Sequence, residues 1–194
     1  MHSHSLADYM NCIYRGDWQG VADLMLLSAD KLAGCGAEFL ICPDNTIHQA
    51  LPFVTPHCPL PWLHIAEVVA DEAAARGFRR LGLTGTRWLV ESNVYPEKLT
   101  ARGLGYRRPT AAERDETNRI IMEELVYAVF RPEGLRVFQQ MIERMKSEGC
   151  DAVVLGCTEF PLIIDDANST LPTLDSTRLL ARAVLRRAVE GASA

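Results

Sequence analysis

The fold is decided by residues 149–159, which read Gly-Cys-Asp-Ala-Val-Val-Leu-Gly-Cys-Thr-Glu. The middle of this stretch, residues 152–155, is a short apolar run of the kind that forms a buried strand in a parallel sheet. Apolar side chains recur at helical spacing over residues 135–148, and a glycine then ends that helix. The stretch therefore predicts a helix, a tight turn, a buried strand and, at Gly156 and Cys157, a loop that carries a thiol.

The same order of elements occurs twice more upstream. Helices are indicated for residues 21–33 and 67–76, each followed by glycine, and buried strands for residues 39–42 and 80–84. Because helix and strand alternate, we expect an α/β fold in which helices flank parallel sheets.

The remaining segments are less regular. Residues 87–131 form a longer, more polar connection, in which Tyr95-Pro96 and residues 107–110 indicate irregular, exposed backbone before a helical pattern resumes over residues 111–129. A short extended piece at residues 171–174 then precedes a last helix over 178–189.

Three positions share one register. Asp44, Gly85 and Cys157 each lie eight residues after a glycine that follows a predicted helix. These glycines are Gly36, Gly77 and Gly149. All three should therefore follow parallel strands at their carboxyl ends, where open α/β sheets bind small ligands. This repeat is consistent with an internal duplication, and it predicts two pseudo-symmetric α/β lobes around a central cleft. We assign residues 1–70, completed by the C-terminal helix 175–194, to the first lobe and residues 71–174 to the second.

Composition excludes several classes of protein. The 194 residues are 48% hydrophobic and 23% charged, with a net charge of −5 and no basic run of the kind that binds nucleic acid. No apolar stretch is long enough to cross a membrane. Residues 1–4 are polar and lack the apolar region of a secretory signal, so we expect a cytoplasmic protein.

Cysteine spacing argues against a metal site and against a disulfide framework. Six cysteines occur without a Cys-x-x-Cys pair, so we expect reduced thiols and no bound metal. Cys157 is the one predicted to do chemistry, because a thiolate at a strand end can act as a base or a nucleophile. It could equally be a small buried apolar residue. Core packing is the better interpretation for the other five cysteines, at positions 12, 35, 42, 58 and 150.

The other candidate site residues are polar groups at the same strand ends. Asp44 is predicted to face Cys157 across the cleft, although aspartate is also a common turn residue. Neutral donors near a helix N-terminus suit a substrate carboxylate, and the same residues could instead only cap the helices. We expect the substrate to be bound by Asn45, Thr46, Gly85, Thr86, Thr158 and Glu159.

Longer motifs resemble one known family. They are residues 45–48, the strand end 82–86, the stretch 154–162, residues 61–66 and the closing Asp175-Ser176-Thr177. Together they are similar to the aspartate/glutamate racemases, over nearly the whole chain. The resemblance implies two half-domains, no pyridoxal phosphate or metal, and a homodimer. It also implies two opposed residues, usually cysteines, of which one removes the α-proton and the other returns it.

The sequence departs from that family at three places. Asp44 stands where the usual racemase carries its first cysteine, and an unperturbed aspartate pKa of about 4 makes it a weaker base than a thiolate near 8.5 unless burial raises it. The family's opening strand and helix, roughly 30 to 45 residues, have no counterpart in this sequence. Leu180 lies where the family is expected to carry a histidine.

Three functions follow from these residues. The first is a cofactor-independent racemase or epimerase of an acidic amino acid, in the aspartate or glutamate class, with Cys157 and Asp44 as the proton-transfer pair. The second is a decarboxylase or isomerase of a small dicarboxylate, which needs only the single thiol to deliver a proton to one face. The third is an inactive relative that binds a small acid without turning it over.

Overall fold

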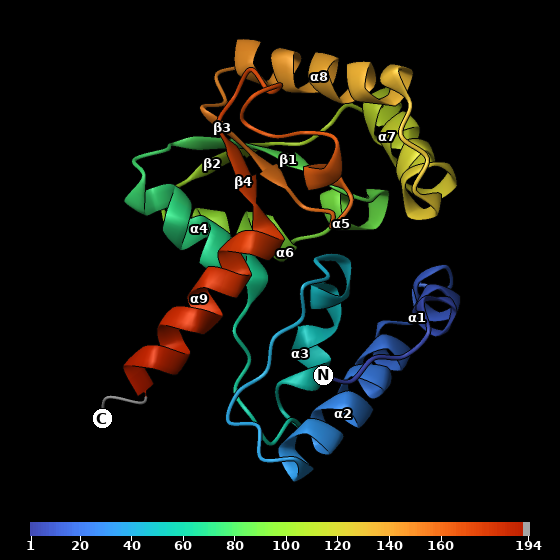
Figure 1. Ribbon diagram of the computed structural model, residues 1–194, viewed down its shortest axis with the longest axis vertical. Coiled ribbons are helices and arrows are strands. Elements are labelled where there is room, and N and C mark those ends of the chain that lie inside the picture. The colour runs from blue at the N-terminus through green and yellow to red at the C-terminus, as the bar shows by residue number, and fades with distance from the viewer. Residues whose placement is uncertain (192–194) are drawn as a thin grey trace. The chain divides into compact units, whose positions relative to one another are not determined.

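The computed structural model describes residues 1–191 and divides the chain into two compact units (Figure 1). The first unit comprises Met1–Cys42 and Ile47–His64, and the second comprises Pro43–Thr46 and Ile65–Ala194. These boundaries differ from those of the predicted lobes, since the last helix, α9 (Ser176–Gly191), packs on α4 (Ile65–Ala75) within the second unit. The last three residues of the predicted segment 175–194 lie outside the described residues. The two pseudo-symmetric lobes and the cleft stay a prediction.

The second unit contains the sheet. Its four described strands are β1 (Arg80–Thr84), β2 (Gly105–Arg107), β3 (Ala152–Leu155) and β4 (Thr173–Asp175), in the order β2-β1-β3-β4. Every neighbouring pair is parallel. The α/β fold with a parallel sheet, predicted from the alternation of helices and strands, is therefore confirmed.

Helices cover both faces of this sheet. Figure 1 shows α7 and α8 on one face and α4, α6 and α9 on the other. Within these layers α7 packs on α8, and α4 packs on both α6 and α9. The bounds not yet given are α5 (Arg87–Glu91), α6 (Val94–Thr100), α7 (Ala111–Glu123) and α8 (Pro132–Ser147).

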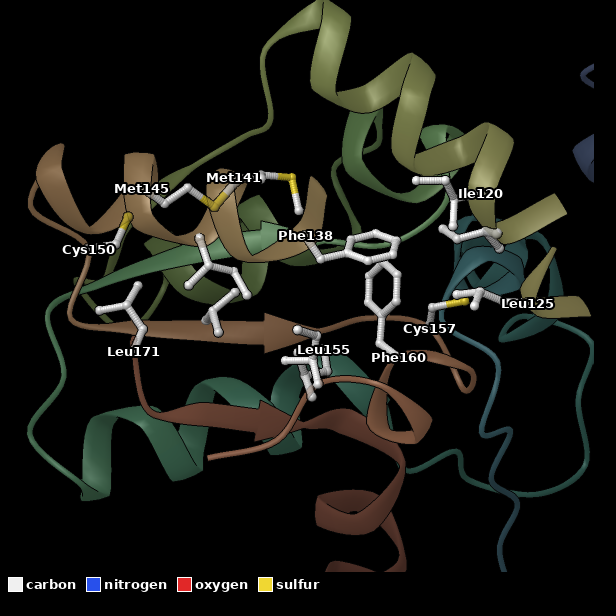
Figure 2. Packing of buried hydrophobic residues seen from close by; sticks show 14 residues of the cluster. Ile120, Leu125, Phe138, Met141, Met145, Cys150, Leu155, Cys157, Phe160 and Leu171 are labelled. Atoms are coloured by element: carbon white, nitrogen blue, oxygen red, sulfur yellow. The ribbon is translucent and has the colours of Figure 1, made fainter. Parts of the chain in front are cut away.

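One hydrophobic core cluster of the second unit lies between α7, α8 and the sheet (Figure 2). Residues of β3 are buried along its whole length, as expected for an inner parallel strand. Phe138 of α8 meets Phe160, which follows β3, edge to face with ring centroids 4.6 Å apart. Because burying one such side chain contributes about 1.5–3 kcal/mol, this cluster holds the loop after β3 firmly against the sheet.

Glycines end the helices where the sequence predicts. Gly77 follows α4 with φ 77° and Gly149 follows α8 with φ 85°, a left-handed conformation that side chains disfavour. Both turns lead directly into buried strands, β1 and β3. Each glycine turn therefore sets where the following strand begins, and the length of that strand sets where it ends.

The first unit is helical. Its described helices are α1 (Leu6–Ile13), α2 (Trp18–Gly34) and α3 (Leu51–Val54). Asp17 caps α2 by accepting a hydrogen bond from the backbone N–H of Gly20.

The strand predicted at residues 39–42 is wrong. Leu40 makes a single parallel bridge with Trp62, through backbone hydrogen bonds of 2.9 Å to Pro61 and from Leu63. Pro43 and Pro61 flank the bridge, and proline has no N–H with which to extend a ladder. The pairing therefore stops at one residue.

The predicted irregular, exposed connection around Tyr95-Pro96 is also wrong. Both residues belong to α6, and Tyr95 is only 2% exposed. Pro96 occupies the first turn of α6, where backbone N–H groups have no partner within the helix and a proline is tolerated. Arg107, predicted in the same irregular class, ends β2. The helix predicted over residues 111–129 is real but ends at Glu123, and a short 3₁₀ turn follows it at Leu125–Tyr127.

No helix among residues 1–191 combines the length and the apolar character that a membrane span requires.

Candidate active site

The carboxyl ends of the strands in the second unit carry most of the predicted site residues. Gly85 and Thr86 follow β1, Gly156 and Cys157 follow β3, and Ser176 follows β4. Since parallel strands end at the same edge of a sheet, these residues lie along one edge. The register counted from glycines thus places Gly85 and Cys157 correctly, whereas no strand precedes Asp44.

Cys157 occupies a position that is both apolar and hydrogen-bonded. Its side chain is 9% exposed and belongs to the core cluster, with Phe160 and Leu125 nearby (Figure 2). The thiol donates a hydrogen bond of 2.8 Å to Oε2 of Glu159. Thr158 donates its hydroxyl to the same carboxylate oxygen, also at 2.8 Å. One carboxylate therefore organises both side chains of this loop.

This environment keeps the thiol protonated. Burial raises the pKa of Cys157 well above its ordinary value. Glu159 raises it further, both by its negative charge and by accepting the hydrogen bond from the thiol, and the charge of Asp44 acts in the same direction. A backbone hydrogen bond lowers the pKa without reversing this balance. In the absence of substrate Cys157 is thus poised as a proton donor.

Two glycines bring the ends of β1 and β3 together. The N–H of Gly156 donates to the carbonyl of Thr84 at 3.2 Å, and a Cβ at position 156 would lie 2.4 Å from that oxygen. At Gly85, where φ is +151°, a Cβ would lie 3.1 Å from the Gly156 carbonyl oxygen. The missing side chain at 156 therefore allows the two backbones to approach each other.

Asp44 lies close enough to Cys157 for its charge to act on the thiol. The residue belongs to the second unit and is exposed. The burial that would turn an aspartate into a proton donor is therefore not supplied by the described residues.

Asn45 and Thr46, the next two residues, are buried and bound to other elements of the same unit. Thr46 Oγ1 lies 2.9 Å from Thr86 Oγ1, and Thr86 also caps α5 by accepting from the N–H of Leu89. Thr86 thus caps a helix, as the structural interpretation predicted. Thr158 does not, because its hydroxyl binds Glu159.

Sequence reasoning missed two residues of this region as site residues, Tyr95 and Ser176. The Tyr95 hydroxyl donates to Oδ1 of Asn45 at 2.6 Å, and Nδ2 of Asn45 donates to Ser176 Oγ at 3.0 Å. Ser176 stands in the closing motif 175–177, which was a usable signal. Tyr95 has no local signal, because its partner lies 50 positions away in the chain.

The other cysteines divide differently from the prediction. None of the six cysteines forms a disulfide, and among the five expected in the core only Cys150 is buried. Cys35, which follows α2, is exposed, so core packing is wrong for it. Residues 1–191 contain no cluster of three or more His, Cys, Asp or Glu side chains arranged to hold a metal ion.

A cavity of about 270 Å³ lies near the ends of β3 and β4 but is lined by other residues. It contains none of the predicted catalytic or substrate-binding side chains. Its lining residues are Leu155, Pro161, Ile164, Asp165, Asp166, Ala167, Thr173, Asp175 and Arg178.

Comparisons with known proteins agree with this architecture. The chain is 31% identical over 155 residues to a glutamate racemase of Thermus thermophilus and 24% identical over 161 residues to the broad specificity amino-acid racemase RacX of Bacillus subtilis. These alignments cover 78% and 81% of this chain. A crystal structure of a candidate Asp/Glu racemase from Yersinia pestis matches it with a TM-score of 0.88 and 30% identity, over 97% of this chain and 82% of that one.

The two curated relatives are longer than this chain, which spans 55% of the glutamate racemase and 67% of RacX. The sequence model of the Asp/Glu/hydantoin racemase family matches residues 1–184, nearly the whole chain. The resemblance inferred from the strand-end motifs is therefore confirmed, and the chain belongs to the Asp/Glu/hydantoin racemase family.

Proposed function

We propose that this protein racemises or epimerises an amino acid of the aspartate or glutamate class by moving the α-proton, without a cofactor. The observation that carries the proposal is the protonated thiol of Cys157 at the end of β3, bound to Glu159 and within reach of the charge of Asp44. Family membership supports the same reaction, and the racemases named among the relatives act on amino acids.

The protonated thiol of Cys157 and the exposed carboxylate of Asp44 suggest how the reaction runs. Exposed Asp44 serves as the base and takes the α-proton from one face, leaving the bonding electrons on the α-carbon next to the carboxylate. The Cys157 thiol gives its proton to the opposite face, which completes the inverted amino acid and leaves a thiolate. The reverse direction passes through the same states: the Cys157 thiolate left by the forward reaction removes the α-proton, and the protonated Asp44 returns its proton to the opposite face.

Neutral donors fit the charge that develops on the substrate carboxylate. Thr46 Oγ1 and Thr86 Oγ1 lie 2.9 Å apart after the end of β1, and hydroxyl donors held in place in this way can stabilise developing negative charge. We propose that these two residues, with Thr158, Gly85 and the backbone of Asn45, bind the carboxylate. Burial at the thiol reduces its contact with water, which strengthens such interactions.

Proton exchange with solvent tests the proposal directly. In D₂O, the wild-type protein should incorporate deuterium at the α-carbon of L- or D-aspartate or glutamate, as measured by NMR or mass spectrometry. Cys157→Ser should lose exchange with inversion at the α-carbon, because a serine hydroxyl is a far weaker acid than a thiol. Cys35→Ser, which changes an exposed thiol, is the matched control and should retain it. Exchange with inversion that persists in the Cys157→Ser protein would remove Cys157 from the mechanism.

A second reaction is favoured by one specific observation. One thiol at the strand ends, Cys157, resting in its protonated form, suits a decarboxylase or isomerase of a small dicarboxylate, where one proton is delivered to one face. A prochiral disubstituted malonate separates the two functions. A single enantiomer of the monoacid would support the decarboxylase, and absence of any product would favour the racemase.

Two further expectations remain proposals. Family membership suggests a homodimer, and the composition of the chain suggests a cytoplasmic protein.

A further inference from the structure

A run of buried hydrogen bonds connects the segment that carries Asp44 to the strand that carries Cys157. The Tyr95 hydroxyl donates to Asn45 Oδ1 at 2.6 Å, Asn45 Nδ2 donates to Ser176 Oγ at 3.0 Å, and Ser176 donates to the carbonyl oxygen of Leu155 at 2.8 Å. Asn45 directly follows Asp44, and Leu155 precedes Cys157 by two residues.

The network fixes the orientation of the Asn45 side chain. Its oxygen accepts from Tyr95 while its nitrogen donates to Ser176, so a flipped amide would lose both partners. Tyr95, Asn45 and Ser176 are each no more than 2% exposed, so water cannot replace a lost bond. Burial also raises the pKa of Tyr95 far above its ordinary value, which keeps the phenol a neutral donor.

The contacts also explain why Asn45 and Thr46 are buried although Asp44, just before them, is exposed. Asp44 is exposed, whereas Asn45 and Thr46 are buried and bonded to α6, α9 and the residue that follows Gly85. These side-chain bonds tie residues 45 and 46 to three other elements of the second unit.

We propose that Tyr95, Asn45 and Ser176 are positioning residues, which hold Asp44 at a fixed place relative to Cys157. They act on Asp44 and Cys157 through the backbone of residues 44–46 and through the backbone at the end of β3. The side chain of Asn45 is hydrogen-bonded within this network. The inference rests on the proposed function, because it assigns these residues to the geometry of that reaction.

The first experiment measures the geometry without measuring catalysis. The charge of Asp44, like the nearer carboxylate of Glu159, raises the pKa of Cys157, so Asp44→Asn should move the pH midpoint of Cys157 alkylation by iodoacetamide downward. Mass spectrometry of the Cys157 peptide separates this thiol from the other five. Tyr95→Phe keeps the ring but removes the donor, and it should cause most of the same downward shift. The double variant Tyr95→Phe/Asp44→Asn should shift no further than Asp44→Asn alone.

A matched control separates positioning from general loss of stability. Thr117 is 1% exposed in α7, and its hydroxyl donates to the carbonyl of Arg114 at 3.2 Å, away from the network. Like Ser176→Ala, Thr117→Val removes a hydrogen bond from a hydroxyl to a backbone carbonyl, here a partly buried one, and it should leave the alkylation midpoint unchanged. Ser176→Ala breaks the network from its other side and should repeat the effect of Tyr95→Phe, which keeps the test valid if one variant fails to fold.

The outcomes distinguish this inference from the proposed function. An unchanged alkylation midpoint in folded Tyr95→Phe and Ser176→Ala proteins, alongside a shifted midpoint in Asp44→Asn, would overturn the positioning role whether or not the enzyme racemises anything. Absence of deuterium exchange in the wild type would instead overturn the function and leave the alkylation result standing. With exchange present, Tyr95→Phe should lower kcat more than it raises KM, since a displaced base affects the chemical step.

Discussion

Cys157 donates a hydrogen bond to Glu159, and this contact adds to burial in making the thiol less reactive. The carboxylate opposes ionisation in two ways, as a nearby negative charge and as the acceptor of the thiol hydrogen bond, after burial itself. Asp44 adds a smaller contribution of the same sign. The site therefore holds back the thiolate until substrate arrives, and a cationic substrate ammonium group would favour its formation.

Glu159→Gln tests this balance. Removing the charge should lower the pKa of Cys157, so the pH midpoint of its alkylation should fall relative to wild type, as followed by mass spectrometry of the modified peptide. Glu143 is exposed on α8, and Glu143→Gln changes net charge equally without touching the thiol. An unshifted midpoint in Glu159→Gln would contradict the hydrogen bond seen between Cys157 and Glu159.

At the scale of single residues the sequence was informative only where the signal was local. Gly85 and Cys157 could be placed at strand ends because a glycine turn and an apolar run lie just before each of them. Asp44 was predicted to face Cys157 because it has the same spacing from a preceding glycine, but the strand predicted before it, at residues 39–42, does not form. The bonds of Asn45 to Tyr95 and Ser176 span 50 and 131 positions, and no local pattern encodes such distances.

Among the elements, α7 and α8 are joined by a partly buried ion pair. Arg144 of α8 contacts both carboxylate oxygens of Glu113 at 2.6 Å, and Glu113 also completes a capping box with Thr110 at the start of α7. Burial raises the pKa of Glu113, but the bonds from Arg144 and Thr110 outweigh it and leave the pKa below its ordinary value.

Glu113→Gln should destabilise the protein by about 1–3 kcal/mol at neutral pH, because a charge-assisted bond and part of a cap are lost. The pKa is depressed in the folded state, so this stabilisation is present above the ordinary glutamate pKa of about 4.3 and is lost as pH falls below it. Urea unfolding of both proteins at pH 7 and near pH 3.5 measures the difference, which should shrink at the lower pH. Glu143→Gln should change stability by less than about 0.5 kcal/mol at either pH.

Element types were predictable where apolar periodicity was long and a glycine ended it, as in α8 with β3. They were not predictable where tertiary context decided. Pro96 looked like a helix breaker but lies in the first turn of α6, and residues 39–42 looked like a strand but find a partner at Leu40 alone.

At the scale of the whole molecule, binding of a small acid can be measured separately from its turnover. Ligand binding to the folded state raises stability by about 2.7 kcal/mol at a hundred times Kd, which corresponds to roughly 5–10 °C in a chain of this size. Thermal unfolding with aspartate, glutamate and their enantiomers should show such a shift for the substrate. Cys157→Ser should keep the shift and lose exchange with inversion, whereas a wild-type shift without exchange would identify the inactive binder.

The homodimer is a prediction at the same scale. Sedimentation equilibrium should give twice the mass of one chain at micromolar concentration. A species with the mass of one chain that still exchanges deuterium would show that one copy suffices for the reaction.

Variant libraries made to change the preferred acid should leave Gly156 unchanged. Even the Cβ of an alanine there would collide with the Thr84 carbonyl oxygen. Nearly every substitution at Gly156 would therefore disrupt the pairing of β1 and β3 and give no information on substrate selectivity. Substitutions are better introduced at an exposed position such as Thr158, whose side chain can change size without forcing two main chains apart.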